Sequence, residues 1–226
     1  MSGSWKWPKG QSGDVALAIG IGALTSVLIV GFLGTTEKLG QRLYPHMGGP
    51  WGRFFVPTLG ALLAGVLVAK YFPEARGSGI PQTKAALIAR NGFISLRTVI
   101  GKFICCSISL GSGISLGREG PSVQMGAGVA SIVGRKLGLS SYQVQSLLPV
   151  GTAAALAAAF NTPIAAVLFT LEEVLSNLHA RVLGSVVISA ATSWMVLHLF
   201  LGDEPLFHVP NYRLVHPSEF LIYAVV

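Results

Sequence analysis

The stretch Gly117-Arg118-Glu119-Gly120-Pro121 sets ionisable groups between two apolar runs, Phe103–Leu116 and Val123–Val133. A carboxylate at membrane depth is costly and is therefore typical of a functional site. The glycines let the backbone leave helical geometry, and Pro121 suits the first turn of a new helix. The pattern predicts that Glu119 lies just outside a helix N-terminus.

A carboxylate at that position predicts an anion site that contains its own competitor. The unpaired N–H groups and the macrodipole of a helix start attract anions. The Glu119 carboxylate would compete with a dissolved anion for these donors, and its protonation would release them. This predicts a gate that responds to pH. The alternative, which the local sequence leaves open, is that Glu119 pairs with Arg118 or only caps the helix.

A second stretch, Gly77-Ser78-Gly79-Ile80-Pro81, repeats the same device ahead of a short helix, Pro81–Asn91. Alone it would be an ordinary Gly-Pro turn with an N-cap serine. Together the two stretches predict two helix starts that face one another across a single anion. The donors would be backbone N–H groups and the Ser78 hydroxyl, without any buried Lys or Arg, so that the anion binds without being trapped.

The composition indicates which elements must hold these stretches. Of 226 residues, 51% are hydrophobic and 11% are charged, which is about half the charged share of a soluble domain. Uncharged runs cover Val15–Thr36, Phe54–Ala69, Phe103–Gly117, Leu137–Leu171 and Val182–Gly202. Some reach the roughly 20 residues that cross a bilayer, and the shorter ones indicate discontinuous helices around a transport site. We expect an all-α polytopic membrane protein.

Other classes of function are disfavoured by the placement of charged residues. The net charge of +7 comes from basic residues that flank apolar runs, which is typical of membrane topology signals and not of nucleic-acid binding. Residues 1–13 are predicted to form a cytoplasmic tail without a cleavable signal peptide. No metal-ligand pair of the His-Glu-x-x-His type occurs, so we expect no metal, no cofactor and no enzyme. The adjacent Cys105 and Cys106 are interpreted as buried small hydrophobes.

Capping residues and proline predict the remaining helices. The expected helices run from Asp14, an N-cap candidate, to about Leu43, then over Trp51–Tyr71, Leu96–Ser109, Ser141 to about Phe160, Pro163 to about Leu178 and Arg181–Leu201. Small residues recur every four positions in two stripes, Gly126-Ala130-Gly134-Gly138 and Gly151-Ala155-Ala159. Such stripes predict close helix packing in lipid. The apolar run Phe220–Val226 is too short to cross a bilayer, so residues 14–226 are expected to be a truncated transmembrane domain.

Glu172 and Glu173 follow the apolar part of the helix that begins at Pro163. Adjacent carboxylates on a helix point about 100° apart, so the two are expected to face different surroundings. The alternative is that both are interfacial and solvated.

Three stretches together resemble the CLC family of chloride channels and chloride/proton antiporters: Gly77–Pro81, Gly117–Pro121, and Ala157–Pro163 leading into Glu172-Glu173. The resemblance covers nearly the whole chain. It implies the first of two inverted-topology repeats of a CLC-type fold, with tilted and discontinuous helices. It also implies a homodimer with a separate pore in each subunit.

The same resemblance implies roles for individual residues. Ser78, Gly79 and Ile80 in one stretch, and Arg118, Glu119 and Gly120 in the other, would bind chloride. Glu119 would be the gating glutamate, and Glu173 would pass protons from the cytoplasmic side, which favours an antiporter. Gln82 departs from the family pattern, because many relatives have glutamate there.

The expected function is therefore chloride/proton exchange across a bacterial-type inner membrane, with the N-terminus in the cytoplasm. The expected partners are chloride, protons, the lipid bilayer and a second copy of the chain. Two alternatives remain open: a passive gated chloride channel, and a non-transporting fragment or assembly unit, because the second half of the implied pore is absent from the sequence.

Overall fold

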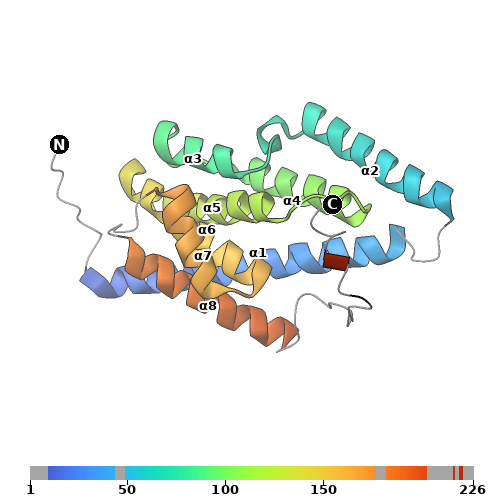
Figure 1. Cartoon of the computed structure of the whole chain (residues 1–226). Coiled ribbons are helices and arrows are strands. Elements are labelled where there is room, and N and C mark those ends of the chain that lie inside the picture. Colours follow the sequence, from blue (N-terminus) through green and yellow to red (C-terminus); the bar gives the residue numbers. More distant parts are fainter. Residues whose placement is uncertain (1–9, 44–48, 177–181, 203–215, 217–218, 221–226) are drawn as a thin grey trace.

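The computed structural model describes residues 10–43, 49–176, 182–202, 216 and 219–220, which Figure 1 shows as a bundle of helices. The helices are α1 (Gly10–Leu43), α2 (Pro50–Lys70), α3 (Ile80–Ala89), α4 (Leu96–Gly111), α5 (Glu119–Lys136), α6 (Ser141–Phe160), α7 (Pro163–Phe169) and α8 (Leu183–Leu201). A 3-10 turn (η1, Pro73–Ala75) precedes α3, and a π-helical segment (η2, Thr170–Val174) continues α7. Within the described residues no strand occurs, in agreement with the predicted all-α class.

Within the described residues, four helices are long and apolar enough to cross a membrane: Gly13–Leu43, Trp51–Lys70, Ser141–Phe160 and Leu183–Leu201. They have different places in the bundle. The most apolar part of α6 is 78% buried inside the protein, whereas that of α2 is only 6% buried. Figure 1 accordingly shows α2 at the upper edge of the bundle and α8 at the lower edge, with α5 and α6 between them. The short α3 confirms the prediction that the helix after the Gly77–Pro81 stretch is too brief to span alone.

The centre of the bundle is the contact between α5 and α6, which depends on small residues. A side-chain carbon added to Gly126 would overlap the Gly151 carbonyl of α6, and one added to Gly151 would overlap the Gly126 carbonyl of α5. The added carbon at Gly126 would also come within 2.6 Å of the Ala155 methyl group. The two predicted stripes therefore pack against each other, and close helix packing at these positions is confirmed.

Buried hydroxyl groups connect α1, α6 and α8. The Ser26 hydroxyl of α1 donates to the Ser193 carbonyl of α8 at 2.8 Å, and the Ser193 hydroxyl donates to the Ala154 carbonyl of α6 at 2.7 Å. Both serines are fully buried. Since a buried hydroxyl is costly without a hydrogen-bond partner, these bonds favour one packing of the three helices.

Several helix boundaries differ from the prediction. Asp14 is not an N-cap, because α1 already begins at Gly10. The helix predicted from Pro163 to Leu178 ends as α-helix at Phe169 and continues as a π-helix to Val174. Ser140 does cap α6, since its hydroxyl accepts from the Gln143 N–H at 3.4 Å. The predicted tail lies outside the described residues up to position 9, as does the end of the chain beyond position 220.

Candidate functional site

The two glycine stretches meet at the starts of α3 and α5, with backbone against backbone. A side-chain carbon at Gly79 would overlap the Gly120 carbonyl, and one at Gly120 would overlap the Ser78 carbonyl. Gly79 also has a φ of +123°, a conformation that residues with a side chain rarely adopt. Glycine is therefore required at both positions for the two loops to approach this closely.

The two helix starts lie side by side and do not face each other. At the other end of the pair, the Ser131 hydroxyl of α5 donates to the Gly92 carbonyl at 2.6 Å and accepts from the Ile94 N–H at 3.0 Å, just beyond the end of α3. α3 and α5 thus run in the same direction. The prediction that the two starts face one another across an anion is wrong, because direct backbone contact leaves no space between them.

A cavity of about 420 Å³ lies beside this contact. The loops contribute Gly77, Ser78, Ile80, Leu116, Gly117, Glu119, Gly120 and Pro121, and α4 contributes Cys106, Ser109 and Leu110. The structure therefore brings Ser78 and Glu119 to one cavity although they are far apart in the sequence. A water molecule occupies about 30 Å³ of liquid, so the cavity has room for a monatomic anion and several waters.

The backbone donors at the start of α3 are not equivalent. The Gly79 N–H donates to the Gln82 side-chain oxygen at 2.8 Å, so this donor is occupied. Within the described residues the Ser78 N–H donates no hydrogen bond, and Ser78 is exposed toward the cavity. Of the two, Ser78 is the residue whose backbone N–H and hydroxyl can serve an anion there, whereas Gly79 does not line the cavity.

Glu119 is the first residue of α5, one position inside the predicted helix boundary. Its carboxylate folds back over Gly117, where an added side-chain carbon would overlap it. Pro121 lies in the first turn of α5, as predicted. The carboxylate therefore lies at the edge of the cavity and at a helix N-terminus, where backbone N–H groups favour negative charge.

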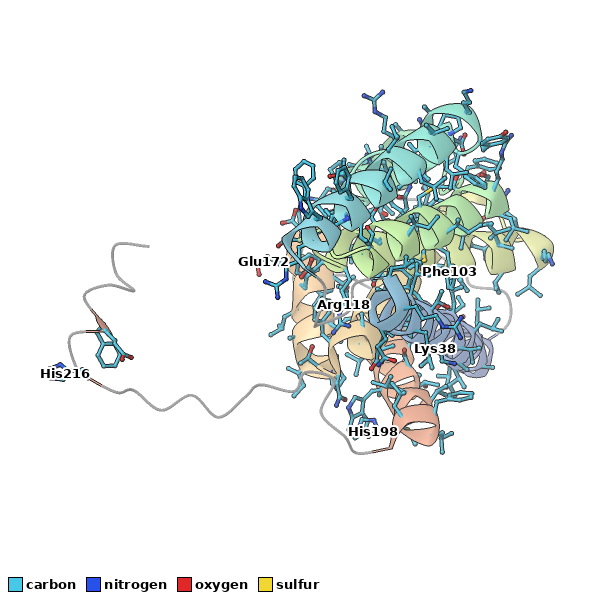
Figure 2. The ribbon with its side chains drawn as sticks, turned by 90° about the vertical axis from the view of Figure 1, so that its right-hand side faces the viewer. Lys38, Phe103, Arg118, Glu172, His198 and His216 are labelled. Carbon is cyan, nitrogen blue, oxygen red and sulfur yellow. The ribbon has the colours of Figure 1, made fainter. Side chains whose placement is uncertain are left out.

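The side chain of Arg118 points elsewhere. Its guanidinium carbon lies 5.2 Å from the centre of the Phe160 ring, at the end of α6. Figure 2 shows Arg118 among the helices. Arg118 does not line the cavity, so a chloride-binding role for this residue stays a prediction that the geometry of its side chain does not favour.

Glu173 lies in the π-helical segment and is paired with α3. The Lys84 ammonium lies 2.8 Å from a Glu173 carboxylate oxygen, with the two side chains 33% and 48% exposed. Glu173 does not line the cavity of Ser78 and Glu119. Figure 2 shows the neighbouring Glu172 at the outer edge of the bundle. Both glutamates are exposed in the structure, so the expectation that they face different surroundings stays a prediction. A π-helical turn is frequent at functional sites because it changes the direction of side chains that follow it.

The sequence reasoning missed Lys102. This lysine of α4 is fully buried, and its ammonium donates to the carbonyls of Ala75 at 2.9 Å and Gly77 at 2.6 Å. Lys102 donates to backbone carbonyls and does not line the cavity, so the expectation that the anion's donors include no buried Lys or Arg stays a prediction. The signal was present in the sequence, since Lys102 is the sole charged residue between Thr98 and Gly117.

The segment before Gly77 is also fixed to α4 through Glu74. The Glu74 carboxylate accepts from the Thr98 hydroxyl at 2.6 Å and from the Ser95 hydroxyl at 3.0 Å. Glu74 lies beyond the end of the membrane-spanning part of α2, and these two hydrogen bonds lower the pKa of its carboxyl group. The approach to the Ser78 loop is thus attached to α4 on both sides of Ala75.

Comparison with known proteins decides the family. Residues 60–226 match the sequence model of the voltage gated chloride channel family. The chain belongs to this family. It is therefore a CLC protein, as the two glycine stretches indicated, and an integral membrane protein.

One relative of this CLC chain is the H(+)/Cl(−) exchange transporter ClcA of Yersinia pestis. The two sequences are 37% identical over 159 residues, and this match covers 69% of this chain and 33% of the relative. ClcA of Vibrio cholerae serotype O1 is 34% identical over 162 residues, 70% of this chain and 35% of the relative. The chain thus spans about a third of the length of these relatives.

Solved CLC structures share the fold. A CLC-type fluoride/proton antiporter superposes with a TM-score of 0.75 at 25% identity, covering 96% of this chain and 55% of the other. A slow cyanobacterial Cl−/H+ antiporter gives a TM-score of 0.70 at 23% identity, covering 94% and 52%. The arrangement of discontinuous helices described above is therefore part of the CLC fold.

Proposed function

We propose that this chain contributes the gated anion site of a chloride/proton antiporter. One observation carries the proposal: Ser78 and Glu119, from separate helix starts, line the same cavity. The similarity to exchange transporters named ClcA supports the choice of chloride and protons as substrates.

The proposed mechanism follows from the chemistry of the two residues. Chloride in the cavity accepts hydrogen bonds from the hydroxyl and backbone N–H of Ser78. The Glu119 carboxylate, when ionised, competes for the donors at the start of α5 and excludes the anion. When Glu119 takes up a proton it loses its charge and admits chloride, so that anion movement and proton movement depend on one side chain.

The test is Glu119→Gln in the purified protein reconstituted into liposomes, with chloride and proton movement recorded together. Glutamine keeps the size of the side chain and cannot take up a proton. Chloride flux should persist but lose its dependence on pH, and coupled proton movement should fall to background. Glu172→Gln is the matched control, because Glu172 is exposed and does not line the cavity. Proton-coupled transport that survives in Glu119→Gln would remove Glu119 from the mechanism.

A passive gated chloride channel is the second candidate. It is favoured by the position of Glu173, which is paired with Lys84 and does not line the cavity, so that an internal route for protons to Glu119 is not continuous through these residues. The reversal potential under opposed chloride and proton gradients separates the two functions, because a channel ignores the proton gradient. Fluoride should be included as a second anion, since one neighbour in fold is a fluoride/proton antiporter.

The proposal includes an assembly and a location. The protein acts as a homodimer in a bacterial-type inner membrane, with its N-terminus in the cytoplasm. Exposed apolar residues on α7 and α8, among them Ile164, Leu168 and Leu199, support a helix surface that pairs with a second copy. A non-transporting assembly unit, the third possibility, would keep this dimerisation but bind no chloride at Ser78.

A further inference from the structure

A second cavity, of about 310 Å³, shares no lining residue with the cavity of Ser78 and Glu119. It lies between the segment after α2, the helix α3, the start of α4 and Gln124 in α5. A water molecule occupies about 30 Å³ of liquid, so this cavity has room for a polyatomic group. Its wall includes Glu74, which lies beyond the membrane-spanning part of α2. The cavity is therefore near the boundary between membrane and water.

Two arginines supply positive charge to this second cavity. Arg76 precedes the Ser78 loop and Arg90 follows α3, and both are exposed. Neither guanidinium makes a hydrogen bond or an ion pair within the described residues. Glu74, the carboxylate of the wall, accepts from two hydroxyl groups of the α4 start and is attracted by Arg90 and Arg97. With three arginines around one carboxylate, the net charge of this region is positive.

Two glutamine side chains add a neutral donor and a neutral acceptor to the wall. The Gln82 oxygen accepts from the Gly79 N–H at 2.8 Å, and the Gln82 amide nitrogen donates no hydrogen bond within the described residues. Gln124 is 3% exposed, and its side-chain oxygen has no hydrogen-bond partner there. The Gln124 nitrogen is 3.5 Å from the Glu74 carbonyl oxygen. A buried oxygen without a donor is costly, so a ligand that can donate a hydrogen bond would stabilise this wall.

This combination of groups suits a phosphate group better than chloride. A guanidinium offers parallel N–H donors that match the oxygens of phosphate in pairs. Chloride can accept these hydrogen bonds but has no proton to donate to the Gln124 oxygen. Inorganic phosphate near neutral pH always carries at least one P–O–H group, and a phosphate monoester carries one in part of its population.

We propose that the second cavity is a binding site for a phosphate group. Arg76 and Arg90 bind the phosphate oxygens, the Gln82 nitrogen donates to the group, and the Gln124 oxygen accepts from its P–O–H. Two sources present this chemistry at a membrane boundary: free inorganic phosphate and the monoester headgroup of phosphatidic acid. The proposal goes beyond the proposed function and does not depend on it, because none of these four residues lines the cavity of Ser78 and Glu119.

The first test measures binding of inorganic phosphate to the purified protein by isothermal titration calorimetry in chloride-free buffer. The double variant Arg76→Gln/Arg90→Gln removes both charges of the wall. We expect its Kd to rise by about tenfold or more, because hydrogen bonds to charged groups are the strong ones. Arg42→Gln/Arg53→Gln is the matched control, since it removes two exposed arginines that do not line the cavity. The control should leave the Kd unchanged.

Sulfate tests the part of Gln124, because sulfate has the shape of phosphate but no proton to donate near neutral pH. We expect the parent protein to bind phosphate about fivefold more tightly than sulfate, which corresponds to one hydrogen bond. Gln124→Met keeps the length of the side chain and removes the acceptor, so it should bind the two anions equally. Where Gln124→Met does not fold, the arginine variant, altered at exposed positions, is decisive.

The source of the phosphate group is found by native mass spectrometry with phosphatidic acid, and with phosphatidylcholine as the reference lipid. Phosphatidic acid that stays on the parent and is lost from Arg76→Gln/Arg90→Gln identifies the lipid headgroup. Equal retention on both, together with weakened binding of inorganic phosphate to the variant, identifies free phosphate.

Three results would overturn the proposal. The first is a parent protein that binds neither inorganic phosphate nor phosphatidic acid. The second is binding of both that is unchanged in Arg76→Gln/Arg90→Gln. The third is displacement of phosphate by an equal concentration of chloride, which would make this a chloride site. Each result leaves the proposed function of Ser78 and Glu119 untouched, because Glu119→Gln tests that function separately.

Discussion

Glu119 and Glu173 are the two carboxylates on which proton movement would depend, and their surroundings differ. Glu119 lies at a helix start on the cavity, whereas Glu173 lies in a π-helical turn and is paired with Lys84 of α3. Since α3 begins at the Ser78 loop, the ion pair links the second carboxylate to the helix that would position the proposed anion site. An exchanger would need both groups, and a channel would need only the first.

Glu173→Ala should keep chloride flux and abolish coupled proton movement in liposomes. The half-exposed ion pair with Lys84 contributes about 0–1 kcal/mol to folding, so the variant should remain folded. Lys84→Met is the informative companion, because it removes the same ion pair but leaves the carboxylate. If proton movement is lost equally in both variants, the ion pair is what matters. If it continues at the parent rate in Glu173→Ala, the internal proton acceptor is another residue.

At the scale of helices, α5 and α6 are in contact through glycines. The contact leaves no space for a side chain at these positions. Gly126 faces the Gly151 carbonyl and the Ala155 methyl group. The start of α5 carries Glu119, so the packing of its middle determines where the Glu119 carboxylate lies. The stability of this contact can be tested without touching the cavity.

Gly126→Ala should destabilise the protein by about 1–3 kcal/mol, because the added methyl group meets backbone and overpacks the helix contact. Gly31→Ala is the matched control. It makes the same change within α1, where nothing lies within 4 Å of the added carbon, and it should be neutral or stabilising by up to about 1 kcal/mol. Thermal unfolding in detergent measures both. Equal melting temperatures for the two variants would contradict the close contact of α5 with α6.

The same elements show which features of the fold could be predicted from the sequence. Helix starts at Pro163 and Ser141, and the stripes through Gly126 and Gly151, were predictable because they follow from local residue types. The parallel course of α3 and α5 was not, because it is determined by contacts such as that of Ser131 with the segment after α3. The hydrogen bonds of Lys102 depend likewise on a loop that lies 25 residues or more before it in the sequence.

At the scale of the whole molecule, the distribution of apolar surface distinguishes helices that face lipid from helices that face protein. α6 is enclosed by the bundle, while α2 and α8 expose most of their apolar residues. Exposure alone does not separate a lipid surface from a dimer surface. Figure 1 shows α7 and α8 adjacent on one side of α6 and away from α2, so a dimer surface on α7 and α8 would leave α2 to the lipid.

Ile164→Trp should convert the proposed homodimer to a monomer. Ile164 on α7 is 78% exposed, and Leu168 on the same helix face is 53% exposed. A bulky ring is tolerated by fluid lipid but overpacks a protein contact, at a cost of about 1–3 kcal/mol in each subunit. Because a two-fold interface contains the same residue twice, one substitution acts at two places.

Leu62→Trp on α2, where Leu62 is 64% exposed, is the matched control and should leave the dimer intact. Subunit counting by single-molecule photobleaching in bilayers measures both variants, and an unchanged dimer in Ile164→Trp would exclude this face of α7 from the interface.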